Sequence, residues 1–324
     1  MALPQGIVTN NATNATLEQW DRTSEAFMLA FAFIGIVSNA ALFISALTTR
    51  PFRKRAKFIA AFSGGTLICD VGAAVILIHR SFRESQYGLM TAMQCLINVP
   101  SILLYSVGEP VMTLCSLIMS LDYCLTLTVS KPACKITERT ASVLIAATVT
   151  ISSVNALLTF LLVYFRGNVL VKNRCYQGEV MDALHVRINY CTIALCSLLS
   201  ALIYMATAII TAAKKSTFPV VRLQQIRRQE AIMKYTSFVV LIMLLSHAIP
   251  FFLIVILSYK VNYTLDSIIF YLYLIFSSAF PVRIFCAKLF AWLLLVKSKV
   301  CLSKAKVSAQ GCSPTKSLDA ANRE

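Results

Sequence analysis

Charged residues are scarce in this chain of 324 residues. Asp, Glu, Lys and Arg make up only 14% of it, whereas 58% of the residues are hydrophobic and the mean hydropathy is +0.72. A soluble domain cannot bury so large an apolar fraction in its core. The composition therefore excludes an ordinary soluble protein and indicates a membrane protein.

The sequence also lacks the common catalytic motifs. It contains neither HExxH, which holds zinc through two histidines one helical turn apart, nor GxSxG, which presents a nucleophilic serine. Its few polar residues inside apolar stretches do not have the spacing of a catalytic aspartate pair. We therefore expect no enzyme activity and no cofactor.

The last apolar stretch has no lysine in its interior. A retinal protein needs a buried lysine there to form the Schiff base, but the nearest ones, Lys260 and Lys288, lie at the ends of the stretch. This absence excludes a retinal-binding protein.

Apolar stretches long enough to cross a membrane are what the sequence does have. A helix needs about 20 residues to span the hydrocarbon core, and the backbone must satisfy its own hydrogen bonds there. The chain is therefore predicted to be an all-α membrane protein, a bundle of seven transmembrane helices. The predicted spans cover residues 27–47, 58–78, 96–121, 142–165, 188–213, 235–259 and 265–282.

The positive charges predict the orientation of this bundle. They concentrate in alternate loops and in the C-terminal tail, so the positive-inside rule places the N-terminus outside and the C-terminus in the cytoplasm. Attraction to anionic lipid explains the net charge of +16 better than nucleic acid does, because the basic residues are divided among loops beside the spans. The expected partner is thus the lipid bilayer, and no nucleic acid is expected.

Four regions follow from these patterns. They are an extracellular N-terminal tail (1–26), the seven-helix bundle (27–284), a short amphipathic eighth helix on the inner leaflet (285–300) and a disordered cytoplasmic tail (301–324). The tails carry candidate modification sites: Asn11 and Asn14 each begin an N-glycosylation triplet, and Cys301 is a palmitoylation candidate.

Two cysteines are predicted to form a disulfide. The chain has eleven cysteines, of which Cys95 and Cys175 form the clear pair on the outer side of the bundle. The outer side is the oxidising one. Cys191, the nearest competitor, falls inside the fifth predicted span.

A layer of polar residues crosses the middle of the predicted bundle. Asn39, Asp70, Glu109 and His247 each lie near the centre of a different span. A lone charge at this depth is costly, so these side chains should face inward and meet one another, a cation, a proton or water. The simpler alternative is that they only form hydrogen bonds that hold helices together.

At this point the sequence resembles the rhodopsin-like G-protein-coupled receptors. The resemblance rests on seven spans, Asn39 in GIVSNA, Asp70 in LICD, and the cysteine that begins the third span and pairs with one in the second outer loop. It implies a plasma-membrane receptor with a heterotrimeric G protein as partner. It also implies that Asp70 holds a sodium ion, with Glu109 at the position of the ligand from the third helix.

The sequence departs from the usual motifs of these receptors, and the departures indicate a more divergent group of them. No arginine follows Asp122 and Tyr123, Ala248 stands where a tryptophan is usual, and Phe280 and Ile284 replace the Asn and Tyr around Pro281. In this loss of motifs the sequence resembles the serpentine chemoreceptor families of nematodes. The candidates for the G-protein interface are Asp122, Tyr123, Arg222, Arg227 and Arg228.

The ligand is predicted to be a small odorant-like molecule or a short peptide. Amine receptors of the family carry an acid seven residues after the third-span cysteine, but here that position is Ile102, which disfavours a biogenic amine. The candidates for the ligand pocket are Ile102, Tyr105, Phe251, Phe252, Tyr271 and Tyr273.

The alternative reading is an ion- or proton-coupled transporter or a ligand-gated channel. Asp70, Glu109, His247 and Arg283 could form a titratable relay through the bundle. Against this reading, the two halves of the chain show no internal similarity, whereas transporters usually contain repeats.

Overall fold

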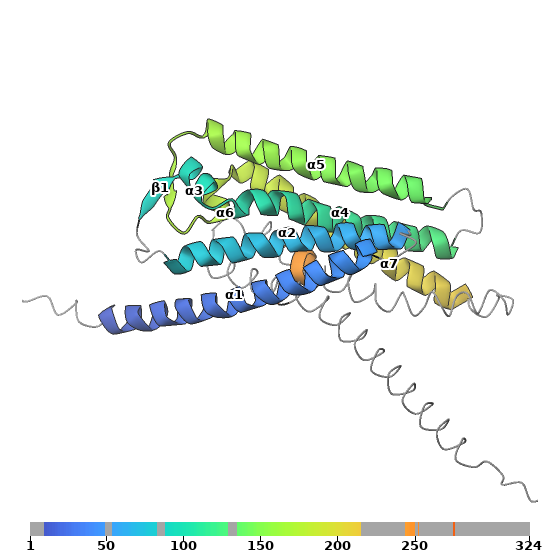
Figure 1. Cartoon of the computed structure of the whole chain (residues 1–324), viewed down its shortest axis with the longest axis horizontal. Helices are drawn as coiled ribbons and strands as arrows, with labels where there is room; N and C mark the ends of the chain where they lie inside the picture. Colours follow the sequence, from blue (N-terminus) through green and yellow to red (C-terminus); the bar gives the residue numbers. More distant parts are fainter. Residues whose placement is uncertain are drawn as a thin grey trace, which may run out of the picture. The chain divides into compact units, whose positions relative to one another are not determined.

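The computed structural model describes residues 10–48, 54–82, 88–128, 135–214, 244–249, 252 and 275, all within a compact unit that covers Met1–Pro281. This part of the chain is almost entirely helical (Figure 1). The long helices are α1 (Asn10–Thr48), α2 (Lys54–Phe82), α4 (Ser101–Thr128), α5 (Glu138–Phe165) and α7 (Ala183–Lys214). The short elements are β1 (Leu89–Thr91), α3 (Ala92–Asn98), β2 (Leu170–Lys172), α6 (Gln177–Val180) and the π-helical turn η3 (Leu244–Ala248).

Five helices in the described ranges are long and apolar enough to cross a membrane. They span Thr23–Thr48, Ala56–Phe82, Ser101–Thr128, Glu138–Phe165 and Ala183–Thr211. They correspond to the first five spans predicted from the sequence, so the membrane-embedded, helical class is confirmed for this part. The predicted sixth and seventh spans lie largely outside the described residues, and the predicted eighth helix lies wholly outside them.

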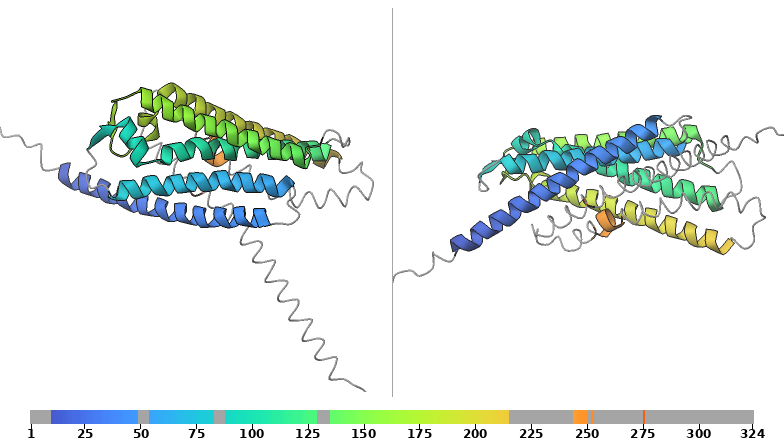
Figure 2. Two further views of the ribbon diagram at one scale, coloured as in Figure 1. Left: turned by 45° about the horizontal axis from the view of Figure 1, so that its top comes forward. Right: turned by 60° about the horizontal axis from the view of Figure 1, so that its bottom comes forward.

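Helix α4 is central to the packing of this unit. It contacts α2, α5 and α7, while α1 packs against α2 (Figures 1 and 2). Within their apolar windows α2 is 61% buried and α4 is 56% buried, compared with 17% for α5. The large exposed apolar face of α5 is consistent with contact with lipid.

Two glycines let the backbones of α2 and α4 touch. A Cβ atom on Gly65 would lie 2.9 Å from the backbone nitrogen of Met112, and one on Gly108 would lie 2.7 Å from the carbonyl oxygen of Gly65 and would collide with the Cys69 sulfur. Small residues at such crossings are typical of helix packing in membranes. The close approach fixes Asp70, which follows Cys69, in register with the middle of α4.

The predicted third span is divided in two. Helix α3 ends at Asn98, and α4 begins at Ser101 after Val99 and Pro100. Pro100 lies at this break, as expected of a residue that cannot continue a helix. The single third span predicted for residues 96–121 is therefore interrupted after Asn98.

A second proline, Pro110, lies inside α4. Because proline has no N–H, the carbonyl of Ser106 loses its helical donor. The Asn155 side chain on α5 replaces that donor, with its Nδ2 3.0 Å from the Ser106 oxygen. A neighbouring helix thus satisfies the freed carbonyl, as is usual in membrane proteins.

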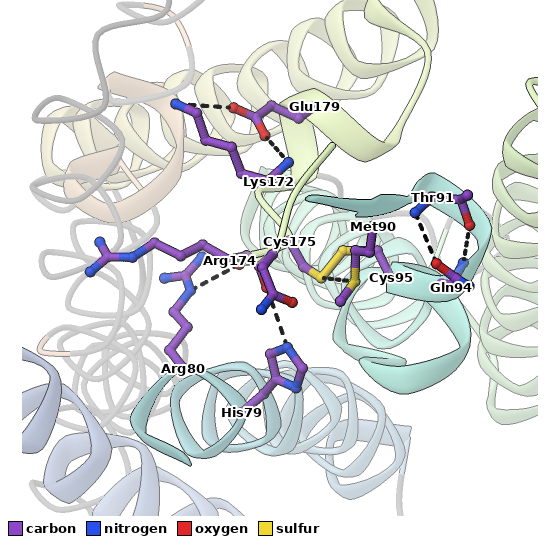
Figure 3. Close-up of a disulfide and its surroundings, with 11 residues drawn as sticks. His79, Arg80, Met90, Thr91, Gln94, Cys95, Lys172, Arg174, Cys175 and Glu179 are labelled. Atoms are coloured by element: carbon purple, nitrogen blue, oxygen red, sulfur yellow. Dashed lines mark hydrogen bonds and ion pairs between the residues drawn. A yellow bond between two sulfur atoms is a disulfide. The ribbon is translucent and has the colours of Figure 1, made fainter. Parts of the chain in front are cut away.

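A disulfide-linked cap covers the end of the bundle at which α2 ends and α4 begins. Strands β1 and β2 pair antiparallel, with Met90 opposite Val171. The disulfide between Cys95 and Cys175 then joins α3 to the segment after β2 (Figure 3). This is the pairing predicted from the sequence.

Candidate functional site

Asn39 and Asp70 meet in the core between α1 and α2. Both residues are 0% exposed, and Asn39 Nδ2 donates to Asp70 Oδ2 at 2.8 Å. Gly35 makes room for this contact, since a Cβ there would lie 2.7 Å from Asp70 Oδ2. The structure therefore brings together the first two members of the predicted polar layer.

Glu109 is buried on α4, where it is 6% exposed. Its Oε2 atom has no hydrogen-bond partner among the described residues. Tyr105, one helical turn earlier and a predicted ligand-pocket residue, lies within electrostatic range of both Glu109 and Asp70. The two carboxyl groups thus share the same region of the core without a hydrogen bond between Asp70 and Glu109 Oε2.

The backbone carbonyl that Pro110 leaves without a helical donor does not explain why Glu109 is buried. A simple structural role would be a bond to the carbonyl that Pro110 leaves without a donor. That carbonyl, on Ser106, accepts instead from Asn155 at 3.0 Å. The burial of the Glu109 carboxyl group therefore calls for another explanation.

Two buried side-chain oxygens of α1 and α4 are of the type that a sodium ion requires. Asn39 Oδ1 and Glu109 Oε2 are both buried and have no partner in the part of the chain that the structure describes. Oxygen ligands suit small hard cations. Within the same ranges, no three His, Cys, Asp or Glu side chains converge on a common point, so a cation here would need backbone oxygens or water as well.

The other predicted core and pocket residues divide into two groups. Ile102 and Tyr105 are buried on α4, at 2% and 8% exposure, whereas Phe252 is 54% exposed. Phe251, Tyr271 and Tyr273 lie outside the described residues. His247 belongs to η3, but its side chain is not among those described.

At the opposite end of α4 from the disulfide, Asp122 forms an ion pair with Lys54 at 2.6 Å. The ammonium group also donates to the carbonyl oxygen of Ile136 at 3.1 Å. Asp122 was predicted from the sequence as a candidate for the G-protein interface, and its pairing with Lys54 was not predicted. Tyr123 is half-buried beside Asp122, and Arg222, Arg227 and Arg228 lie outside the described residues.

A network of small polar side chains, also missed, connects α4 with α5 and α7. Ser106 bonds to Thr159 at 3.2 Å, and Thr159 bonds to His185 Nε2 at 3.0 Å. Nearer the Asp122 end, Ser200 contacts Ser116 at 3.1 Å and Ser120 at 2.7 Å. This network could not be predicted from hydropathy, because serine and threonine are common in transmembrane helices whether or not they form hydrogen bonds between helices.

The cap is also tied to the end of α2. Arg80 lies over the ring of Tyr176, 4.8 Å from its centroid, and its Nε donates to the Arg174 carbonyl oxygen at 3.2 Å. His79 lies 3.4 Å from the carbonyl oxygen of Asn173 (Figure 3). The segment that carries Cys175 is therefore held by α2 as well as by the disulfide.

The predicted modification sites receive no test from this geometry. Asn11 and Asn14 fall in the first turns of α1, but their side chains are not among those described. Cys301 lies outside the described residues.

No protein-family model and no curated protein matches the sequence.

Proposed function

We propose that this chain is a cell-surface receptor with seven transmembrane helices, which couples binding of a small molecule or short peptide to a heterotrimeric G protein. The observation that carries the proposal is the course of α4. This helix begins next to the disulfide-linked cap, passes Tyr105 and Glu109 in the core, and ends next to the Lys54–Asp122 ion pair. A shift of α4 on ligand binding would reach the cytoplasmic end directly.

The polar core supplies a reason for such a shift. A buried carboxyl group without a hydrogen-bond partner is costly in its charged form. Glu109 is therefore sensitive to a cation, a proton or a ligand that approaches it from the interior. In this proposal Asp70 and Glu109 hold a sodium ion, and Asn39 orients the Asp70 carboxylate through the bond at 2.8 Å.

The rest of the proposal continues the resemblance of the sequence to divergent rhodopsin-like receptors and nematode chemoreceptors. In that framework the chain lies in the plasma membrane with a glycosylated N-terminus outside. Asp122, Tyr123 and the basic residues Arg222, Arg227 and Arg228 form the G-protein interface. Coupling would then use an Asp122 held by Lys54, in place of the usual pairing with a neighbouring arginine.

A second candidate function is an ion- or proton-coupled transporter or a ligand-gated channel. The observation in its favour is the same orphaned Glu109 Oε2, because a buried acid without a partner can carry a proton. The tight contact of α2 with α4 at Gly65 and Gly108 counts against it, since no water path can run between those two backbones there.

The experiment that separates the two functions is a ligand screen with two readouts. Cells expressing the full chain and a promiscuous G protein are exposed to small volatile compounds and short peptides, while second messenger and whole-cell current are both recorded. The receptor proposal expects second-messenger responses that vanish in cells without G protein. Currents that persist in those cells would support the transporter or channel instead.

A further inference from the structure

A cavity of about 140 Å³ lies between α4, α5 and α7, beside Pro110. It is separate from the ligand pocket predicted from the sequence, since neither Ile102 nor Tyr105 lines it. It is also separate from the Asn39–Asp70 pair. Cavities of about 150 Å³ are large enough to hold a molecule the size of benzene.

The mouth of the cavity is apolar and faces outward. Two of its lining residues, Ile151 on α5 and Ile188 on α7, are 58% and 57% exposed. In helices that cross a membrane, such exposed aliphatic side chains face lipid. A ligand would therefore enter from the hydrocarbon core, which selects for uncharged molecules.

The interior of the cavity contains two polar groups with nothing to bind. Asn189 on α7 is 8% exposed and Thr113 on α4 is 1% exposed, and both line the cavity. Neither Asn189 Nδ2 nor Thr113 Oγ1 has a hydrogen-bond partner among the described residues. Buried polar groups are almost always paired, and an orphan is expensive.

The orientation of the Asn189 amide is set by its neighbour. Asn155 donates to the Ser106 carbonyl at 3.0 Å with its Nδ2, and the same nitrogen lies 3.5 Å from Asn189 Oδ1. The oxygen of Asn189 is thus directed to α5, which leaves its N–H groups as the donors available to the cavity.

We propose that this cavity binds a small uncharged molecule of about one six-membered ring, whose carbonyl or hydroxyl oxygen accepts hydrogen bonds from Asn189 Nδ2 and Thr113 Oγ1. The apolar mouth accommodates the ring, and a carbonyl oxygen can accept both bonds. The site does not depend on the proposed function, because it would exist in a receptor, a transporter or a channel.

The test uses the full chain purified in phosphatidylcholine nanodiscs and a one-ring photoreactive probe, 3-trifluoromethyl-3-phenyldiazirine. Mass spectrometry maps the labelled residues after irradiation. We expect labels on cavity residues such as Leu114, Thr192 and Cys196. Cyclohexanone should compete for this labelling at a concentration about threefold to tenfold lower than methylenecyclohexane, which has the same shape without the oxygen.

Two substitutions test whether Asn189 and Thr113 cause the difference in potency between the two competitors. Asn189→Leu and Thr113→Val should bring the two competitors close to equal potency. Thr150→Val on the exposed face of α5, whose hydroxyl bonds to its own helix at 3.0 Å, should leave the difference unchanged. Absence of label from the cavity, or equal competition by the two compounds in the unmodified chain, would overturn the proposal even if a variant failed to fold.

Discussion

Lys54 at the start of α2 and Asp122 near the end of α4 form an ion pair of 2.6 Å, in which the two side chains are 22% and 4% exposed. The same ammonium group reaches the carbonyl oxygen of Ile136, just before α5. One lysine thus joins three segments of the chain at the end of the bundle opposite the disulfide. Its removal would leave the Asp122 carboxylate buried without its cation.

We predict that Lys54→Met lowers the free energy of unfolding by about 1–3 kcal/mol, because loss of one partner leaves an uncompensated, mostly buried charge. The measurement is thermal or denaturant unfolding of the purified chain. Lys57→Met is the matched control, since Lys57 lies on the same helix and donates to the exposed Ser142 hydroxyl at 2.9 Å. Equal effects of the two substitutions would show that the ion pair adds nothing.

The double variant Lys54→Met with Asp122→Leu sharpens this test. Because it removes both charges together, it should recover most of the lost stability. A double variant as unstable as the single one would contradict the pairing.

In the proposed receptor the single variant Lys54→Met should also raise the basal signal per receptor at the cell surface, since α4 loses its link to α2.

The disulfide gives a prediction about cell-surface levels. Cys95→Ser and Cys175→Ser should each lower surface expression to a similar degree, and the double variant should be no worse than either, because both single variants break the same bond. Surface labelling of intact cells measures this directly. Clear additivity of the two effects would count against the bond.

The contact between α2 and α4 predicts a strong effect of one methyl group. Gly108→Ala should destabilise the chain by about 1–3 kcal/mol, because the new Cβ would collide with Cys69 and lie 2.7 Å from the Gly65 oxygen. Gly178→Ala in α6 is the control, since nothing lies within 4 Å of its added Cβ. Unfolding of both variants under the same conditions should separate them; tolerance of alanine at position 108 would contradict the packing.

The polar core predicts different roles for the two acids. Glu109→Gln should fold normally, because it removes a buried carboxyl group that has an unpartnered oxygen, and it should reduce any sodium dependence of the ligand response. Asp70→Asn should alter signalling more than surface expression. A Glu109→Gln variant that misfolds and retains full sodium dependence would leave Glu109 with a structural role only.

The membrane class and the first five spans were predictable because long apolar stretches have few alternatives. The disulfide was predictable because Cys95 and Cys175 were the clear pair on the outer side of the predicted bundle. The contact of Lys54 with Asp122 was not, because residues 68 positions apart in sequence carry no periodic signal that joins them. The cavity beside Pro110 was also missed, since the sequence shows neither which helices pack together nor which amides lack partners.

Nucleotide exchange on a purified heterotrimeric G protein measures the proposed coupling without other cell components. The full chain in nanodiscs is combined with G protein and a ligand found in the screen, and uptake of a non-hydrolysable GTP analogue is followed. If the proposed coupling exists, ligand should speed the exchange and Lys54→Met should change the basal rate. Unchanged exchange, together with ligand-evoked ion flux into liposomes that contain the protein, would contradict it.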